Sequence, residues 1–106
     1  MELEKFQREM AKRFKDFDKK SGPFFLMTVL AAEVGELADA VKDDEREALK
    51  EELADTVFTL VSLANVYDVD LSNALEEKYL KRSAREISKK WREPYLGERV
   101  REFEKK

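Results

Sequence analysis

Glycine and proline interrupt this chain of 106 residues at few places, and the long stretch between the outer breaks has helical spacing. One break is Ser21-Gly22-Pro23 near the start, and Pro94 and Gly97 form another near the end. Between them apolar residues recur every three or four positions, and no stretch sustains the period-two alternation of a half-buried strand. The sequence therefore predicts an all-α fold, and its length fits a single domain over residues 1–106.

The apolar pattern resolves into four helices and a shorter fifth segment. The four are predicted over residues 3–19, 24–41, 46–67 and 71–91. The polar turn at residues 42–44 is short, so the second and third helices should form an antiparallel hairpin. The tail after Pro94 has Val100 and Phe103 as its strong apolar anchors and is predicted as a short fifth helix. Together these segments predict a four- to five-helix bundle.

Each of the first three helices has one apolar face, which we expect to be buried. The residues of these faces are Leu3, Phe6, Met10, Phe14 and Phe17 in the first helix, Leu26, Leu30, Val34, Leu37 and Val41 in the second, and Leu49, Leu53, Val57, Leu60, Val61 and Ala64 in the third. The second and third helices have more apolar positions than one short helix can cover. The pattern therefore predicts association into a dimer or a higher oligomer.

Composition excludes several classes of function. The chain has no cysteine and no histidine, which excludes disulfides, thiolate and imidazole metal sites, and histidine acid–base catalysis. Its 21 basic and 24 acidic side chains give a net charge of −3, which is not the pattern of a nucleic-acid binder. No apolar run is long enough to span a bilayer, and no signal peptide is visible at the start. We expect a cytoplasmic protein with no nucleic-acid or membrane partner.

Four carboxylates form two pairs with matched spacing. Glu33 and Glu36 lie three residues apart, as do Glu52 and Asp55, so each pair shares one face of its helix. If the hairpin has its apex near Asp44, Glu36 faces Glu52 and Glu33 faces Asp55. Four acids brought together in this way need a cation to remain ionised. Sites made only of carboxylates favour hard cations such as Mg²⁺ or Mn²⁺.

The same pairs have a simpler interpretation as solvated helix faces, because acids three residues apart arise often by chance in a chain with 24 of them. Two observations favour a site instead. Neither pair has a basic residue three or four positions away on its own face, where Ala40 and Thr59 stand. The row that carries the second pair is otherwise small, which leaves room for ions, water and a ligand. From the residues alone both interpretations stay open.

A resemblance to a known family adds to this argument. The segment Ala32-Glu33-Val34-Gly35-Glu36-Leu37-Ala38-Asp39-Ala40, followed by Glu51-Glu52-Leu53-Ala54-Asp55-Thr56-Val57-Phe58, resembles the MazG-like all-α nucleoside triphosphate pyrophosphohydrolases. The similarity covers about residues 24–87 and continues through Val69-Asp70-Leu71 and Lys78-Tyr79-Leu80-Lys81. Two positions depart from the family pattern, which often has glutamate where Ala32 stands and asparagine where Tyr79 stands.

The resemblance implies hydrolysis of a nucleoside triphosphate between its α and β phosphates, with Mg²⁺ as the cofactor and Mn²⁺ as a possible substitute. It implies that Glu33, Glu36, Glu52 and Asp55 are the metal ligands. Glu33 and Glu36 are also the catalytic candidates, Glu33 by orienting the attacking water. Family members assemble as dimers or as pairs of dimers, which agrees with the surplus of apolar positions.

The resemblance also suggests substrate contacts on other elements. Lys81 and Arg85 lie four apart on the predicted fourth helix and map onto the basic phosphate contacts of the family. Asn65 is a candidate for the base or sugar, and Phe14 is one of several phenylalanines that could stack on a base. Two alternatives remain: phosphoribosyl-ATP pyrophosphohydrolase on the same fold, and a non-catalytic helical interaction module whose acids only solubilise it.

Overall fold

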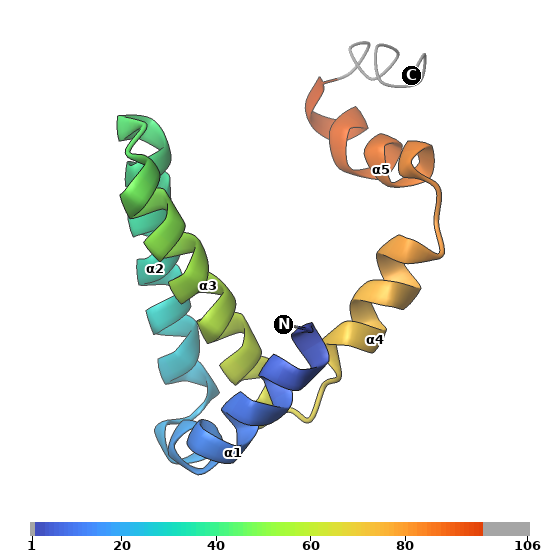
Figure 1. Ribbon diagram of the computed structural model, residues 1–106. Coiled ribbons are helices and arrows are strands. Elements are labelled where there is room, and N and C mark those ends of the chain that lie inside the picture. Colours follow the sequence, from blue (N-terminus) through green and yellow to red (C-terminus); the bar gives the residue numbers. More distant parts are fainter. Residues whose placement is uncertain (1, 97–106) are drawn as a thin grey trace. The chain divides into compact units, whose positions relative to one another are not determined.

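The structure is a computed structural model that describes residues 2–96 (Figure 1). Its elements are α1 (Leu3–Ser21), α2 (Pro23–Asp43), α3 (Arg46–Val66), α4 (Leu71–Leu75), the π-helix η1 (Glu76–Leu80) and α5 (Ala84–Leu96). No strand occurs in this part of the chain, which confirms the predicted all-α class. The chain divides into two compact units, Met1–Leu71 and Ser72–Lys106, and the single domain over residues 1–106 stays a prediction.

Two short breaks define the first unit. Gly22 has a φ of 90°, which glycine adopts without strain, and its N–H donates to the Asp18 carbonyl at 2.9 Å. Pro23 then starts α2 at a position where its missing N–H costs no hydrogen bond. At the other end of α2, the backbone of Asp44 adopts the left-handed conformation, and the N–H of Glu45 donates to the Ala40 carbonyl at 3.2 Å.

The tight turn at residues 44–45 folds α3 back along α2, so the predicted antiparallel hairpin is present (Figure 1). Helix α1 packs mainly against α3. The rings of Phe14 and Phe58 meet edge to face, with centroids 5.4 Å apart. Val61, which is completely inaccessible to solvent, lies at the centre of this three-helix unit.

A buried amide network also ties α1 to the end of α3. The Gln7 Nε2 group donates to Asn65 Oδ1 at 3.1 Å and to the Val69 carbonyl at 2.6 Å. Asn65 Nδ2 donates to the Gln7 carbonyl at 3.2 Å, and Gln7 Oε1 accepts the Leu71 N–H at 3.1 Å. Both side-chain amides are buried, and these bonds satisfy them. The network fixes the position of α1 on the hairpin.

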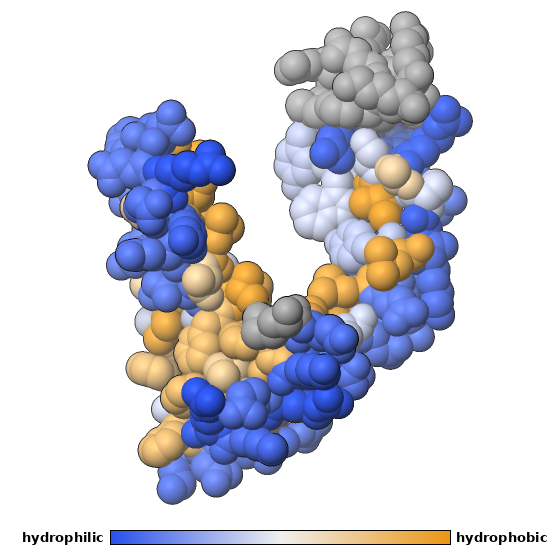
Figure 2. All heavy atoms as spheres, viewed as in Figure 1, coloured by the Kyte–Doolittle hydropathy of each residue, from blue (hydrophilic) through white to orange (hydrophobic). Residues whose placement is uncertain are grey.

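The predicted buried faces were too wide. Six of their residues are exposed in the structure: Phe17, Val34, Val41, Leu53, Val57 and Leu60. The physical reason is that α1 covers only one side of the α2–α3 pair. Figure 2 shows hydrophobic side chains on the visible surface of this pair. The surplus of apolar positions seen in the sequence is therefore a surface feature of the single chain.

The prediction of one continuous helix over residues 71–91 is wrong. It is divided into α4, the π-helix η1 and the start of α5, with a bend at residues 81–83. The Ser83 hydroxyl accepts the Glu86 N–H at 3.2 Å, which caps the new helix and explains why α5 starts there. Helix α5 then continues through Pro94, where the sequence predicted a break. The tail helix predicted around Val100 and Phe103 lies outside the described residues.

Candidate functional site

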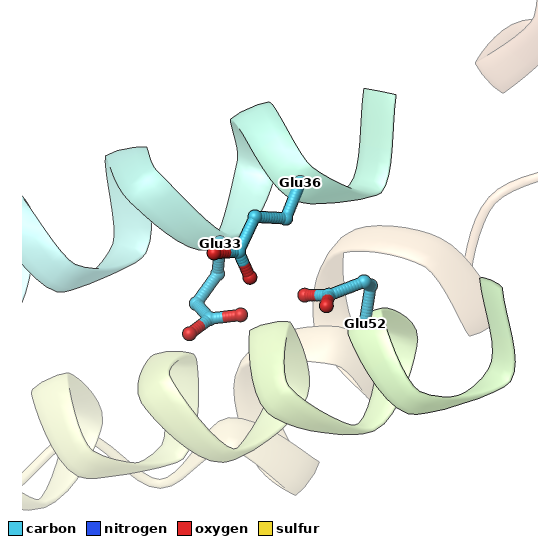
Figure 3. A group of neighbouring side chains, drawn as sticks. All are labelled: Glu33, Glu36 and Glu52. Atoms are coloured by element: carbon cyan, nitrogen blue, oxygen red, sulfur yellow. The ribbon is translucent and has the colours of Figure 1, made fainter. Parts of the chain in front are cut away.

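Three glutamates from two helices meet inside the hairpin. Glu33 and Glu36 lie one turn apart on α2, and Glu52 lies opposite them on α3 (Figure 3). One carboxylate oxygen from each residue lies within 4.8 Å of the others, an arrangement that could hold a metal ion. Glu33 and Glu52 are half-buried, and Glu36 is exposed. We call these three residues the acid cluster.

The hairpin brings the cluster together for local reasons. Glu33 and Glu36 share a face because three residues advance nearly one helical turn. The turn at residues 44–45 is short, and Ala40 is buried close to it. The two helices therefore hold the carboxylates between rigid backbones rather than on loops.

The electrostatics of the cluster are unfavourable without a counter-charge. Glu33 Oε2 and Glu52 Oε2 are buried and have no hydrogen-bond partner within the described chain. Two ionised carboxylates only accept hydrogen bonds, so neither can satisfy the other. A proton on Glu52 can be shared with Glu33, and this hydrogen bond is the main cause that raises the pKa of Glu52 to about 7. Burial and the negative charge of Glu36 raise it further in the same direction.

Stability of the metal-free protein is expected to fall as pH rises from about 4.5 to about 7. Folded Glu52 keeps its proton up to a pKa of about 7, whereas the unfolded chain releases it near 4.5. The folded state binds more protons in this window, so the contribution is complete below the lower value and lost above the higher one. Melting temperatures at pH 5 and pH 8 without divalent ions test this expectation. Glu52→Gln should reduce the difference in melting temperature between pH 5 and pH 8. An unchanged difference in that variant would contradict the expectation.

Asp55 does not join the acid cluster. The carboxylate oxygens that lie within 4.8 Å of one another belong to Glu33, Glu36 and Glu52, and the predicted place of Asp55 opposite Glu33 in the ligand set stays a prediction. Aspartate is one methylene shorter than glutamate, and Asp55 is exposed. It nevertheless lines a cavity that Glu33 also lines, so the two carboxylates border a common space.

This cavity has a volume of about 330 Å³ and is bordered by α1, α2 and α3. Its polar lining consists of carboxylates and hydroxyls, and no basic side chain of residues 2–96 lines it. The small residues that the sequence placed beside the acids border it as expected. The carboxylates are those of Asp18, Glu33 and Asp55, the hydroxyls are those of Thr59 and Ser62, and Phe25 and Phe58 supply aromatic rings. The sequence analysis missed Asp18, although it lies four residues after Phe14 on the same face of α1.

The two residues predicted to contact phosphate, Lys81 and Arg85, lie in different elements of the structure. Lys81 lies in the bend that ends η1, and Arg85 lies in the first turn of α5. The prediction that they share one helix face is wrong, because the helix breaks between them. Both residues belong to the second compact unit. Their contact with phosphate stays a prediction.

The other two predicted substrate residues have structural partners. Asn65 is buried, and its amide is bonded to Gln7. Phe14 is half-buried, and its ring packs on Phe58. These contacts give both residues a part in holding α1 on α3. Their roles in substrate binding stay predictions.

Comparison with known proteins identifies the class. The family model of the MazG nucleotide pyrophosphohydrolase domain matches residues 22–88, which is more than half of the chain and contains the whole acid cluster. The chain therefore belongs to the MazG nucleotide pyrophosphohydrolase family, and the resemblance noted in the sequence is confirmed.

No curated protein matches the chain. Among the helices of residues 2–96, none combines the length and apolar character needed to cross a bilayer.

Proposed function

We propose that the protein is a Mg²⁺-dependent nucleoside triphosphate pyrophosphohydrolase. It cleaves the bond between the α and β phosphates and releases a nucleoside monophosphate and pyrophosphate. The observation that carries the proposal is the acid cluster within the segment matched by the family model. Three carboxylates point at one another, and two of their buried oxygens have no hydrogen-bond partner in the described chain, an arrangement that favours the binding of a cation.

The donor set fits a hard divalent cation. Glu33, Glu36 and Glu52 offer only carboxylate oxygens, which suit Mg²⁺ and also Mn²⁺. Asp55 belongs to the proposed ligand set because it borders the same space as Glu33. When bound, the ion would neutralise phosphate charge and lower the pKa of a coordinated water.

The residues themselves supply the remaining chemistry. Glu33 is the proposed group that orients the attacking water, because it lies both in the acid cluster and at the edge of the adjoining cavity. Glu36 is the proposed metal ligand on the exposed side of the cluster, and it helps to position the ion for the reaction. Lys81 and Arg85 are the proposed cationic contacts for the polyphosphate, one as a point charge and the other as a planar fork.

Association of two or more copies is part of the proposal. The three-helix unit exposes large apolar side chains, among them Phe24 at 88% and Val41 at 62% of their full accessible area. Soluble monomers rarely expose many such residues together. A dimer or a higher oligomer would cover them. Sedimentation that shows a stable monomer at micromolar concentration would contradict this proposal.

The function is tested by pyrophosphate release from a panel of ribo- and deoxyribonucleoside triphosphates and phosphoribosyl-ATP. We expect release with Mg²⁺ and none after chelation with EDTA. Turnover confined to phosphoribosyl-ATP would favour the alternative enzyme on the same fold. Absence of turnover on every compound would favour a non-catalytic interaction module.

Binding of the ion has a readout that does not depend on turnover. At pH 8, Mg²⁺ should raise the melting temperature because it binds the folded cluster and not the unfolded chain. The increase should grow with the Mg²⁺ concentration and disappear in Glu52→Gln. A melting temperature indifferent to Mg²⁺ would contradict the proposed metal site.

A further inference from the structure

Most residues that line the cavity beside the acid cluster have no part in the proposed reaction. Glu33 belongs to the acid cluster and also lines the cavity. A ligand with its phosphates at the cluster would therefore have its nucleoside end within reach of the cavity. The volume of about 330 Å³ lies near the lower end of small-molecule sites, which run from roughly 300 to 1,000 Å³. This volume suits one nucleobase with its sugar.

Two phenylalanines provide flat surfaces at this cavity. The ring of Phe58 is held on one edge by Phe14, and Phe58 keeps 37% of its accessible area. Phe25 enters from α2 and is 55% exposed. Partly exposed aromatic rings beside a cavity suit stacking on a base, and stacking alone does not distinguish one base from another.

The polar lining supplies the discrimination, because it consists almost entirely of hydrogen-bond acceptors. Asp18, the lining carboxylate that is not a proposed metal ligand, only accepts hydrogen bonds when it is ionised. The Thr59 hydroxyl donates its proton to the Asp55 carbonyl at 2.9 Å, so its lone pairs are what it offers to a ligand. The Ser62 hydroxyl can turn to donate or to accept. A ligand that brings N–H donors is therefore favoured over one that brings carbonyl oxygens.

We propose that this cavity binds the nucleobase and selects bases that carry an exocyclic amino group, with the Asp18 carboxylate accepting an N–H of that group. The inference rests on the proposed function. Cytosine, adenine and guanine have such an amino group, whereas uracil and thymine present carbonyl oxygens instead. Asp18 suits this role because it is the lining residue that α1 contributes and forms no ion pair in the described chain.

The test compares substrates that differ in the exocyclic group of the base and in the protonation of the ring nitrogen next to it. dCTP and dUTP differ in an amino group against a carbonyl, and so do dATP and dITP. We expect kcat/KM to favour the amino-bearing member of each pair by at least about tenfold, since a site that hydrogen-bonds a substrate N–H discriminates against the analogue without it. Asp18→Asn should bring both ratios close to one, because an amide can donate to a carbonyl as well as accept from an amine.

Asp16→Asn is the matched control. Asp16 is exposed on the same helix and does not line the cavity, so this variant should keep both ratios and the wild-type kcat/KM. Wild-type ratios near one, or ratios unaffected by Asp18→Asn, would overturn the inference and leave the proposed function intact.

A binding measurement separates the inference from catalysis. Titration with dCMP and dUMP, followed by NMR or calorimetry, should show tighter binding of dCMP to the wild type and equal binding to Asp18→Asn. If this preference appears without turnover on any triphosphate, the cavity assignment stands and the proposed reaction falls. If neither monophosphate binds and no triphosphate turns over, both fall.

Discussion

Glu52→Gln is expected to lower pyrophosphate release by at least roughly a hundredfold, because residues that only support a metal ligand already contribute about 10- to 100-fold. Glu52 is the one member of the acid cluster that comes from α3, and it interacts with both Glu33 and Glu36. Glutamine keeps the shape of the side chain and removes its charge. The variant therefore loses the charge of one of the two proposed ligands on α3, the one that belongs to the acid cluster.

The same substitution should have the opposite effect on the metal-free fold. Glutamine can donate to Glu33, which leaves fewer unpartnered carboxylate oxygens and less repulsion from Glu36. At pH 8 without divalent ions, Glu52→Gln should melt at a temperature equal to or above that of the wild type. Loss of activity together with unfolding would mean that the residue has a structural role, and the argument for a metal ligand would fail.

Glu51→Gln is the control for both measurements. Glu51 precedes Glu52 on α3, is exposed, and is not a member of the acid cluster. The substitution Glu51→Gln removes one negative charge from α3, as Glu52→Gln does, so general electrostatic effects should appear equally in both variants. Equal loss of turnover in the two variants would contradict the assignment of Glu52 as a specific ligand.

The hairpin and its acid cluster could be predicted because local rules decide them. A short polar turn that ends in a left-handed Asp44 specifies the antiparallel pair, and a spacing of three residues aligns Glu33 with Glu36. Sequence symmetry placed Asp55 opposite Glu33 as an equal of Glu52. Symmetry of residue numbers ignores side-chain length, and the longer glutamate is the one that reaches the cluster.

Features that depend on distant partners could not be predicted in this way. Gln7 is buried because it bonds to Asn65, 58 residues further along the chain, and nothing in its own neighbourhood marks it. The division of the predicted helix over residues 71–91 is a second example. Apolar spacing continues through residues 71–91, but the hydrogen bonds shift to the π pattern at Glu76–Leu80, and Ser83 caps a new helix.

Val61→Asp is expected to unfold the three-helix unit. Val61 has 0% of its side chain accessible, and helices α1, α2 and α3 form the unit around it. An uncompensated buried charge costs about 3–5 kcal/mol, and the lost burial of valine adds roughly 1.5–3 kcal/mol. A unit of this size has a net stability of roughly 4–10 kcal/mol, so most or all of it should be lost.

Val57→Asp is the matched variant, since it makes the same change one helical turn earlier on α3. Val57 is 46% exposed, so its carboxylate can remain hydrated and the helix content by circular dichroism should stay close to that of the wild type. Its expected effect is on association, because it puts a charge into the apolar surface that the proposed oligomer covers. Cooperative folding of Val61→Asp, or unfolding of Val57→Asp at the same temperature, would contradict the placement of the core between α1 and the hairpin. A folded Val57→Asp with an unchanged sedimentation coefficient would instead place the subunit contact on another face.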